Sequence, residues 1–171
     1  MNTLIIYATK HGTTEKCADT LSKKLAGNVD LHYLKKDQSV DITKYDCIII
    51  GGSIYAGKIQ KEIPSFCLQN IDILKKKRLG LFICCMFKGD AEIQLNKNFP
   101  KELLDSAIAK ESFGGEMLFS RMSFIEKTLT KMVSKMAGKN GDGLPQMDMK
   151  TDLSMISEES IDNFAKAFNR I

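Results

Sequence analysis

Apolar runs and amphipathic segments alternate along most of the chain. Four runs rich in apolar and β-branched residues predict strands, and they cover residues 3–8, 29–34, 46–50 and 79–87. The run 29–34 alternates apolar with polar residues, which is typical of a strand near the edge of a sheet. The other three runs are apolar on both faces and predict buried strands. A fifth strand is expected over residues 113–119.

Between these runs, apolar residues recur every three or four positions, which predicts helices. The expected helices cover residues 13–26, 61–70, 91–109 (with a break near Pro100) and 157–171. Ser157 is placed to cap the last helix. The apolar face of that helix carries Ile161, Phe164, Ala165 and Phe168. Buried strands that alternate with helices indicate a parallel sheet with helices on both faces, so the pattern predicts a doubly wound α/β domain.

One segment departs from this alternation. Residues 121–137 combine a methionine-rich apolar face with basic side chains, and a glycine-rich turn follows at 138–143. We expect a single domain over residues 1–171, with an insertion at about 120–156 that lies before the last helix or within the last strand. A basic amphipathic helix over 121–137 is compatible with peripheral contact to an anionic membrane or a partner. Packing on the domain is the other interpretation, and the short length of the helix favours it slightly.

Composition supports a globular domain and narrows its setting. The 171 residues are 43% hydrophobic and 27% charged, and no apolar run is long enough to cross a bilayer. Five cysteines form no C-x-x-C pair, and two histidines are too few for a zinc site, so no metal is expected. We interpret the cysteines as reduced, buried thiols in a cytoplasmic protein, with Cys84 and Cys85 facing opposite sides of one strand. A net charge of +4 is too small to indicate nucleic-acid binding.

The first candidate site is the loop after the first predicted strand. In open parallel sheets, ligands bind beyond the carboxyl ends of the strands. This loop contains Thr9, Lys10, His11, Gly12, Thr13 and Thr14. Hydroxyls and free amides at a helix N-terminus suit a phosphate group, and the loop has neither the G-x-G-x-x-G pattern of dinucleotide sites nor a Walker lysine. The other interpretation is an ordinary capped helix.

Two further loops follow the third and fourth predicted strands. The second loop contains Gly51, Gly52, Ser53, Ile54, Tyr55, Ala56 and Gly57. Its paired glycines allow a planar ligand to approach the backbone, and Tyr55 is the candidate for stacking on an aromatic ring. The third loop contains Cys84, Cys85, Met86, Phe87, Lys88 and Gly89. Each loop is also compatible with an ordinary turn, but together the three loops form a phosphate site followed by two walls for a ring.

These motifs resemble those of the flavodoxin family. Its phosphate loop has the form T-x-[TH]-G-x-T, which residues 9–14 match. The resemblance is closer to the branch that includes menaquinone-dependent protoporphyrinogen dehydrogenase, and it covers residues 3–14, 51–57, 114–125, the basic segment before Gly138 and the last helix. It implies a flavodoxin-like five-stranded sheet in the order 2-1-3-4-5.

The same resemblance implies FMN as the cofactor. The FMN phosphate would contact Thr9, His11, Gly12, Thr13 and Thr14. The isoalloxazine ring would lie between the second and third loops, with Gly52–Gly57 on one side and Cys85–Gly89 on the other. No side chain is assigned as a catalytic acid or base, because the flavin performs the electron or hydride transfer.

The activity implied is that of an FMN-dependent oxidoreductase that oxidises protoporphyrinogen with a quinone as acceptor. The alternatives are an electron carrier between redox proteins and an FMN quinone reductase. Electron-carrying flavodoxins tend to be acidic and to have an acidic, aromatic third loop, whereas this chain is net basic and has Met86, Phe87 and Lys88 there. The expected redox partner is therefore a porphyrinogen, a quinone or an electron-transfer protein.

Overall fold

The computed structural model describes residues 1–86, 91–123, 127–128 and 151–170. These residues divide into two compact units, and each is described here by itself. The first unit comprises Met1–Gly115 and Met155–Ile171, and the second comprises Glu116–Ser154. Among the described residues, no helix is both long enough and apolar enough to cross a membrane.

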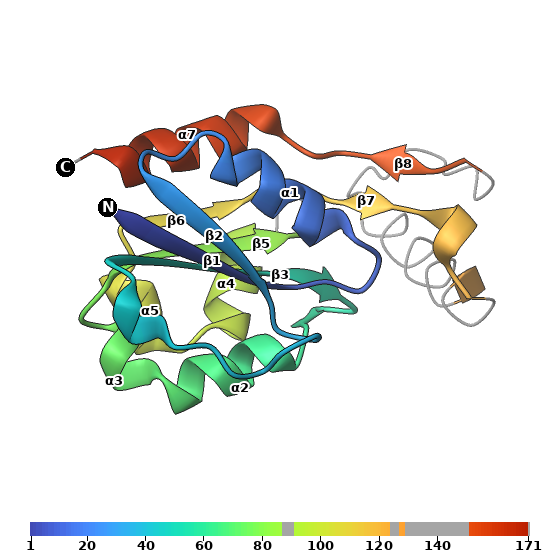
Figure 1. Ribbon diagram of the computed structural model, residues 1–171. Helices are drawn as coiled ribbons and strands as arrows, with labels where there is room; N and C mark the ends of the chain where they lie inside the picture. Colours follow the sequence, from blue (N-terminus) through green and yellow to red (C-terminus); the bar gives the residue numbers. More distant parts are fainter. Residues whose placement is uncertain (87–90, 124–126, 129–150, 171) are drawn as a thin grey trace. The chain divides into compact units, whose positions relative to one another are not determined.

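The first unit is built on a parallel sheet (Figure 1). Its strands are β1 (Asn2–Ala8), β2 (Asn28–Tyr33), β3 (Cys47–Tyr55), β5 (Arg78–Cys84) and β6 (Ala109–Ser112). They lie side by side in the order β2-β1-β3-β5-β6, and all four neighbouring pairs are parallel. A short strand, β4 (Lys58–Ile59), pairs antiparallel with the end of β3. The predicted order of the parallel strands is confirmed.

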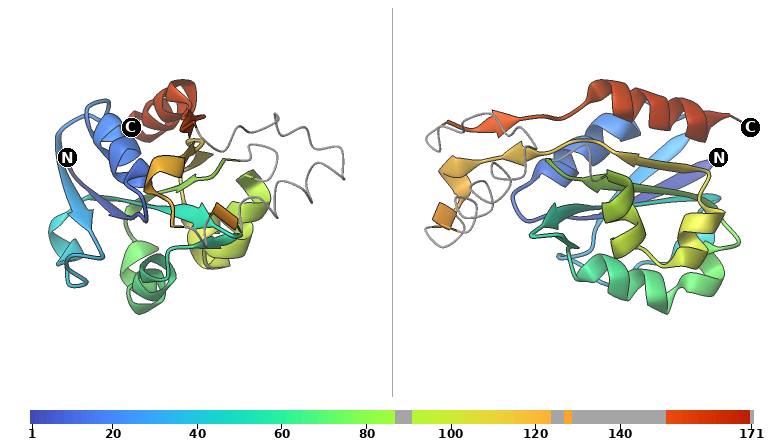
Figure 2. Two further views of the ribbon diagram at one scale, coloured as in Figure 1. Left: turned by 90° about the vertical axis from the view of Figure 1, so that its right-hand side faces the viewer. Right: turned by 180° about the vertical axis from the view of Figure 1, so that it is seen from behind.

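Helices cover both faces of this sheet (Figures 1 and 2). One face carries α1 (Thr13–Ser22) and α7 (Glu158–Asn169). The other face carries α2 (Glu62–Gln69), α3 (Ile71–Leu74), α4 (Ala91–Asn98) and α5 (Lys101–Ser106). A 3-10 turn, η1 (Ile42–Lys44), precedes β3. Each face has its own apolar core, which is the arrangement expected of a doubly wound domain.

The last helix confirms its prediction in detail. The Ser157 side chain accepts a hydrogen bond from the Ser160 amide at 3.2 Å and so caps the N-terminus of α7. All four residues of the predicted apolar face are buried. Phe164 packs edge-on against Phe82 of β5 and against Phe113, which directly follows β6. Gly80 makes this approach possible, since a Cβ there would lie 2.7 Å from the Phe164 ring.

The predicted fifth strand over 113–119 was wrong. The fifth parallel strand is β6, which reads Ala-Lys-Glu-Ser and lies at the edge of the sheet. Such a short polar edge strand has no apolar alternation that would mark it in the sequence. The predicted helix over 91–109 therefore includes the first residue of β6, whereas α5 ends at Ser106. The buried Phe113 that suggested a strand lies just beyond the end of β6.

The second unit contains a short antiparallel pair. Strands β7 (Glu116–Met117) and β8 (Leu153–Ser154) are partners, and the turn η3 (Phe119–Arg121) follows β7. Ser120 donates hydrogen bonds from its amide and its hydroxyl to the Asp152 carboxylate, at 2.9 and 2.7 Å. Most of the predicted basic helix over 121–137 and all of the turn at 138–143 lie outside the described residues.

Candidate functional site

Strand register in the first unit brings the three candidate loops to one edge of the sheet. Ala8 at the end of β1 is the register partner of Gly52 in β3. Ser53 in turn is the partner of Cys84 at the end of β5. The residues that follow these strand ends therefore lie next to one another at the carboxyl edge, where ligands of doubly wound sheets bind.

The loop after β1 has the geometry of an anion site. Its Gly12 has a φ of 96°, a left-handed conformation that favours glycine, and its amide donates to the Thr9 hydroxyl at 3.0 Å. Helix α1 begins directly afterwards, and the Gly12 carbonyl accepts the Lys16 amide at 3.1 Å. Among the residues that the structure describes, no side chain caps α1, which leaves the amides of its first turn as candidate donors to a ligand.

Two buried hydroxyls at this edge make no hydrogen bond of good geometry to another described residue, although one of them, that of Thr14, faces the weakly accepting Cys84 thiol. They are Thr14 Oγ1 in the first turn of α1 and Ser53 Oγ near the end of β3. Buried polar atoms in folded proteins are almost always satisfied, so an unpartnered hydroxyl at a ligand edge indicates a missing polar ligand. The donor set of free helix amides and buried hydroxyls fits a phosphate ester.

The second loop is a β-hairpin in the structure. Strand β3 continues through the paired glycines to Tyr55, and the chain reverses at Ala56 and Gly57, whose φ values are 49° and 75°. Positive φ at both turn positions is the signature of a type I′ hairpin. The side chain of Asn98 in α4 holds the returning strand, because its Oδ1 accepts the Ile59 amide at 2.8 Å.

Tyr55, the candidate stacking residue, lies half-buried at the end of β3. The Lys10 ammonium group sits 3.9 Å from the centroid of its ring, within the range of a cation–π interaction. Lys10 belongs to the first loop, so this contact joins the first loop to the second. Lys58 is the cross-strand partner of Tyr55 and places a second cation beside it.

The third loop is described in part. Cys85 is buried and Met86 is half-buried, while Phe87, Lys88 and Gly89 lie outside the described residues. Gly115 packs close to this loop, since a Cβ on it would approach the Met86 amide nitrogen to 3.0 Å. His11 in the first loop is half-buried.

The cysteines are buried thiols, as predicted. None of the five forms a disulfide, and Cys84 and Cys85 enter the cores on opposite faces of the sheet. The neighbouring Cys17 thiol and burial hold the pKa of Cys84 well above its ordinary value, and burial raises the pKa of Cys67 to about 12. Such thiols stay protonated and unreactive, so they do not supply redox chemistry.

Four residues near the site escaped the sequence analysis. They are Tyr7, Glu15, Tyr33 and Asn98, which come from β1, α1, β2 and α4. Each acts through a contact between elements, and no local motif marks it.

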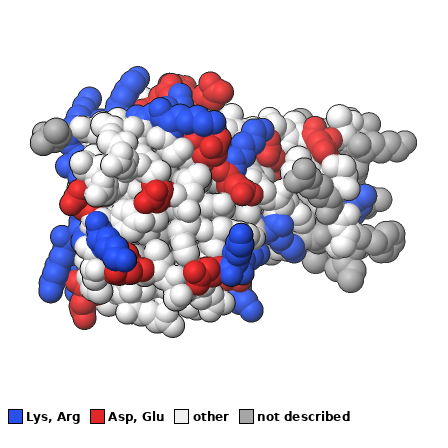
Figure 3. Space-filling view, in the orientation of Figure 1, with Lys and Arg blue, Asp and Glu red and all other residues white. Residues whose placement is uncertain are grey.

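The surface charge of the first unit is mixed. On the face shown in Figure 3, its basic and acidic side chains are interspersed, so the modest net positive charge is not concentrated in one patch there.

Comparisons with known proteins agree with this geometry. A family model described as a flavodoxin domain matches residues 4–143. No curated protein is similar enough to match the chain.

Solved structures share the fold at low sequence identity. The rubredoxin oxygen:oxidoreductase of Desulfovibrio gigas is 19% identical with a TM-score of 0.53, and the match covers 81% of this chain and 35% of that one. A flavodoxin from the domain Archaea is 12% identical with a TM-score of 0.51, and the match covers 81% of this chain and 98% of that one. A Fusobacterium nucleatum flavodoxin mutant bound to flavin mononucleotide is 17% identical with a TM-score of 0.43, and the match covers 64% of this chain and 66% of that one. The chain thus spans about a third of the length of the Desulfovibrio enzyme.

Proposed function

The chain belongs to the flavodoxin family, and we propose that it is an FMN-dependent oxidoreductase that oxidises protoporphyrinogen with a quinone as acceptor. FMN is the cofactor of the domain, and the domain has a redox function. When bound, FMN supplies the electron or hydride transfer, while the protein positions it and excludes competing reactions.

The observation that carries the cofactor site is the pair of buried hydroxyls without a well-formed hydrogen bond, next to an α1 N-terminus that no described side chain caps. The residues proposed to hold the phosphate are Thr9, Lys10, His11, Gly12, Thr13 and Thr14. The residues proposed to line the ring are Gly52, Ser53, Ile54, Tyr55, Ala56, Gly57, Cys85, Met86, Phe87, Lys88 and Gly89. Their loops follow adjacent strands at one edge, in the order that phosphate and ring require.

Two features support an enzyme over a carrier. The chain is net basic, and a second unit of about forty residues separates β6 from α7. The choice of porphyrinogen as substrate and of quinone as acceptor rests on the resemblance of the loop and insertion motifs to those of the protoporphyrinogen dehydrogenase branch. A quinone acceptor also suits a cytoplasmic protein that touches the membrane surface through residues 121–137.

An electron carrier is the second candidate function, and the match to 98% of the archaeal flavodoxin favours it.

Cofactor binding is tested by replacing Thr13 and Thr14 together with alanine. Each hydrogen bond to a charged group contributes about 1.5–3 kcal/mol, so the dissociation constant for FMN should rise at least 10-fold. Thr20→Ala is the matched control, because Thr20 lies farther along α1 and its hydroxyl donates to the Lys16 carbonyl. Unchanged FMN affinity in the double variant would refute the phosphate loop.

The activity is tested with the FMN-loaded protein under anaerobic conditions. We expect saturable conversion of protoporphyrinogen to fluorescent porphyrin that depends on an added quinone. Stepwise reductive titration of the flavin, followed by its visible absorption, should show transfer in two-electron steps. Reduction in one-electron steps without porphyrin formation would identify a carrier and overturn the proposed activity.

A further inference from the structure

We propose that Tyr33 is a positioning residue that fixes the phosphate loop through the carbonyl of Thr9. This inference rests on the phosphate site of the proposed function, and it is independent of the substrate. Tyr33 ends β2, outside the three loops that the sequence marks as the site.

The contact that carries the proposal joins β2 to the loop after β1. The Tyr33 hydroxyl donates to the Thr9 carbonyl at 3.3 Å. The Thr9 hydroxyl accepts the amide of Gly12 at 3.0 Å. Thr9 is therefore held at its carbonyl by one element and at its side chain by the turn that starts α1, so Tyr33 restrains the path of the loop into the helix.

The Tyr33 ring is itself well anchored. It stacks on Tyr7, its register partner in β1, with ring centroids 5.3 Å apart and planes 15° from parallel. The Tyr33 carbonyl accepts the amides of Lys36 and Asp37 at 3.0 and 3.2 Å, which fixes the backbone behind the ring. A donor that is held in place in this way restrains the loop more than a mobile, exposed side chain would.

The partner ring extends the same support to the helix. Tyr7 is buried, and its hydroxyl donates to the Glu15 carboxylate at 3.2 Å, in the first turn of α1. Burial is the main cause that raises the pKa of both tyrosines, so both phenols remain donors at neutral pH. The stacked pair therefore holds the loop at Thr9 and the helix at Glu15.

A loop held in its bound form loses less conformational freedom when it binds a ligand, which increases affinity. The hydrogen bond from Tyr33 to the phosphate loop is made to Thr9, so its effect should depend on the phosphate of the ligand. Riboflavin has the ring of FMN without the phosphate. The comparison of FMN with riboflavin therefore separates positioning of the loop from general stability.

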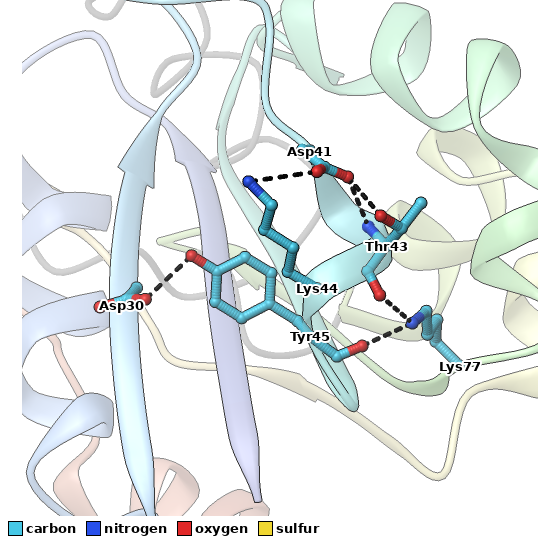
Figure 4. Close-up of polar contacts among 6 residues, drawn as sticks. All are labelled: Asp30, Asp41, Thr43, Lys44, Tyr45 and Lys77. Carbon is cyan, nitrogen blue, oxygen red and sulfur yellow. Dashed lines mark hydrogen bonds and ion pairs between the residues drawn. The ribbon is translucent and has the colours of Figure 1, made fainter.

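The test is Tyr33→Phe, which removes the hydroxyl and keeps the ring stack. The matched control is Tyr45→Phe, because the Tyr45 hydroxyl donates at 2.9 Å to Asp30, which belongs to β2 as Tyr33 does (Figure 4). Asp30 pairs with Leu4 in the first half of β1, so this bond lies away from the loop that follows Ala8. Dissociation constants for FMN and riboflavin are measured by quenching of flavin fluorescence. We expect Tyr33→Phe to weaken FMN binding about 3- to 10-fold, the effect of one neutral hydrogen bond, with riboflavin binding unchanged. Tyr45→Phe should change neither.

A second measurement uses inorganic phosphate on the apoprotein. Phosphate should raise the midpoint of thermal unfolding of the wild type and of Tyr45→Phe, and raise it less for Tyr33→Phe. Equal loss of FMN and riboflavin affinity, or full phosphate stabilisation of Tyr33→Phe, would overturn the positioning role. A wild type that binds FMN no better than riboflavin would refute the phosphate site itself, which is a distinct result.

Discussion

Thr14 affects stability and ligand binding in opposite directions. Its hydroxyl is buried beside the Cys84 thiol, a weak acceptor, and makes no hydrogen bond of good geometry to a described residue, which costs free energy in the apoprotein. Thr14→Val keeps the shape and should raise the free energy of unfolding of the apoprotein by about 1 kcal/mol, while FMN binding weakens about 10-fold. Urea denaturation and flavin titration measure the two effects.

Thr3→Val is the control for this prediction. Thr3 is also buried, and its hydroxyl likewise lies beside a thiol, that of Cys47, without a well-formed hydrogen bond to a described residue, but it lies at the opposite end of β1 from the site. The control should show a gain in stability without a change in FMN affinity. If Thr14→Val lost stability, or bound FMN as tightly as the wild type, the Thr14 hydroxyl would not be a ligand-binding group.

At the same scale, local motifs account for what the sequence could predict about the site. Thr9 to Thr14 are contiguous, so their hydroxyls and glycine identify a candidate phosphate loop before any fold is known. Tyr33 and Asn98 act across elements, and their contacts depend on strand register and helix packing. No local pattern specifies such contacts.

Among the elements, the hairpin that carries Tyr55 has an unusual turn residue. Ala56 has a φ of 49°, although an alanine in the left-handed region is disfavoured by about 1–2 kcal/mol. Asn-Gly is a favoured sequence for such turns, so Ala56→Asn should raise the free energy of unfolding by about 0.5–1 kcal/mol. Urea denaturation measures the change.

Gly57→Ala provides the opposite case in the same turn. A Cβ at Gly57 would meet nothing within 4 Å, but its φ of 75° disfavours any side chain. This variant should therefore lose about 1 kcal/mol through backbone conformation alone. A loss of stability in Ala56→Asn as well would show that the turn does not control the hairpin.

Element boundaries were predictable where burial imposes a pattern. The interior strands β1, β3 and β5 are continuous apolar runs, and α7 has a complete apolar face. The edge strand β6 has only Ala109 and Ser112 buried, so the sequence around it resembles a helix end. Phe113 is buried for another reason, because its ring stacks on Phe82 at 4.6 Å.

For the whole molecule, alkaline pH should reduce stability through Tyr7. Burial, followed by the Glu15 carboxylate, raises its pKa in the folded state from 10.0 to about 12. A raised pKa means that the folded state keeps its proton after the unfolded state has lost it. The stabilising contribution is therefore complete below pH 10 and is lost as pH rises toward 12.

The measurement is the free energy of unfolding of the apoprotein in urea between pH 9 and about pH 11.5, a range that brackets the ordinary tyrosine pKa. Tyr7→Phe removes the titrating group, so its stability should decline less steeply over this range than that of the wild type. Equal slopes for the two proteins would show that Tyr7 titrates normally in the folded state.

The point at which the chain leaves and re-enters the first unit has a consequence for the family's history. Gly115 is the last residue before the excursion and Met155 the first after it, and the Met155 amide donates to the Gly115 carbonyl at 2.8 Å. Ser157 makes the same kind of bond to the Phe113 carbonyl at 2.9 Å, immediately before α7. With both ends tied together, the entropy of closing the intervening loop changes only slowly with its length. The segment between Gly115 and Met155 can therefore be lengthened, shortened or exchanged in evolution while α7 still packs on the sheet, so this junction tolerates insertions.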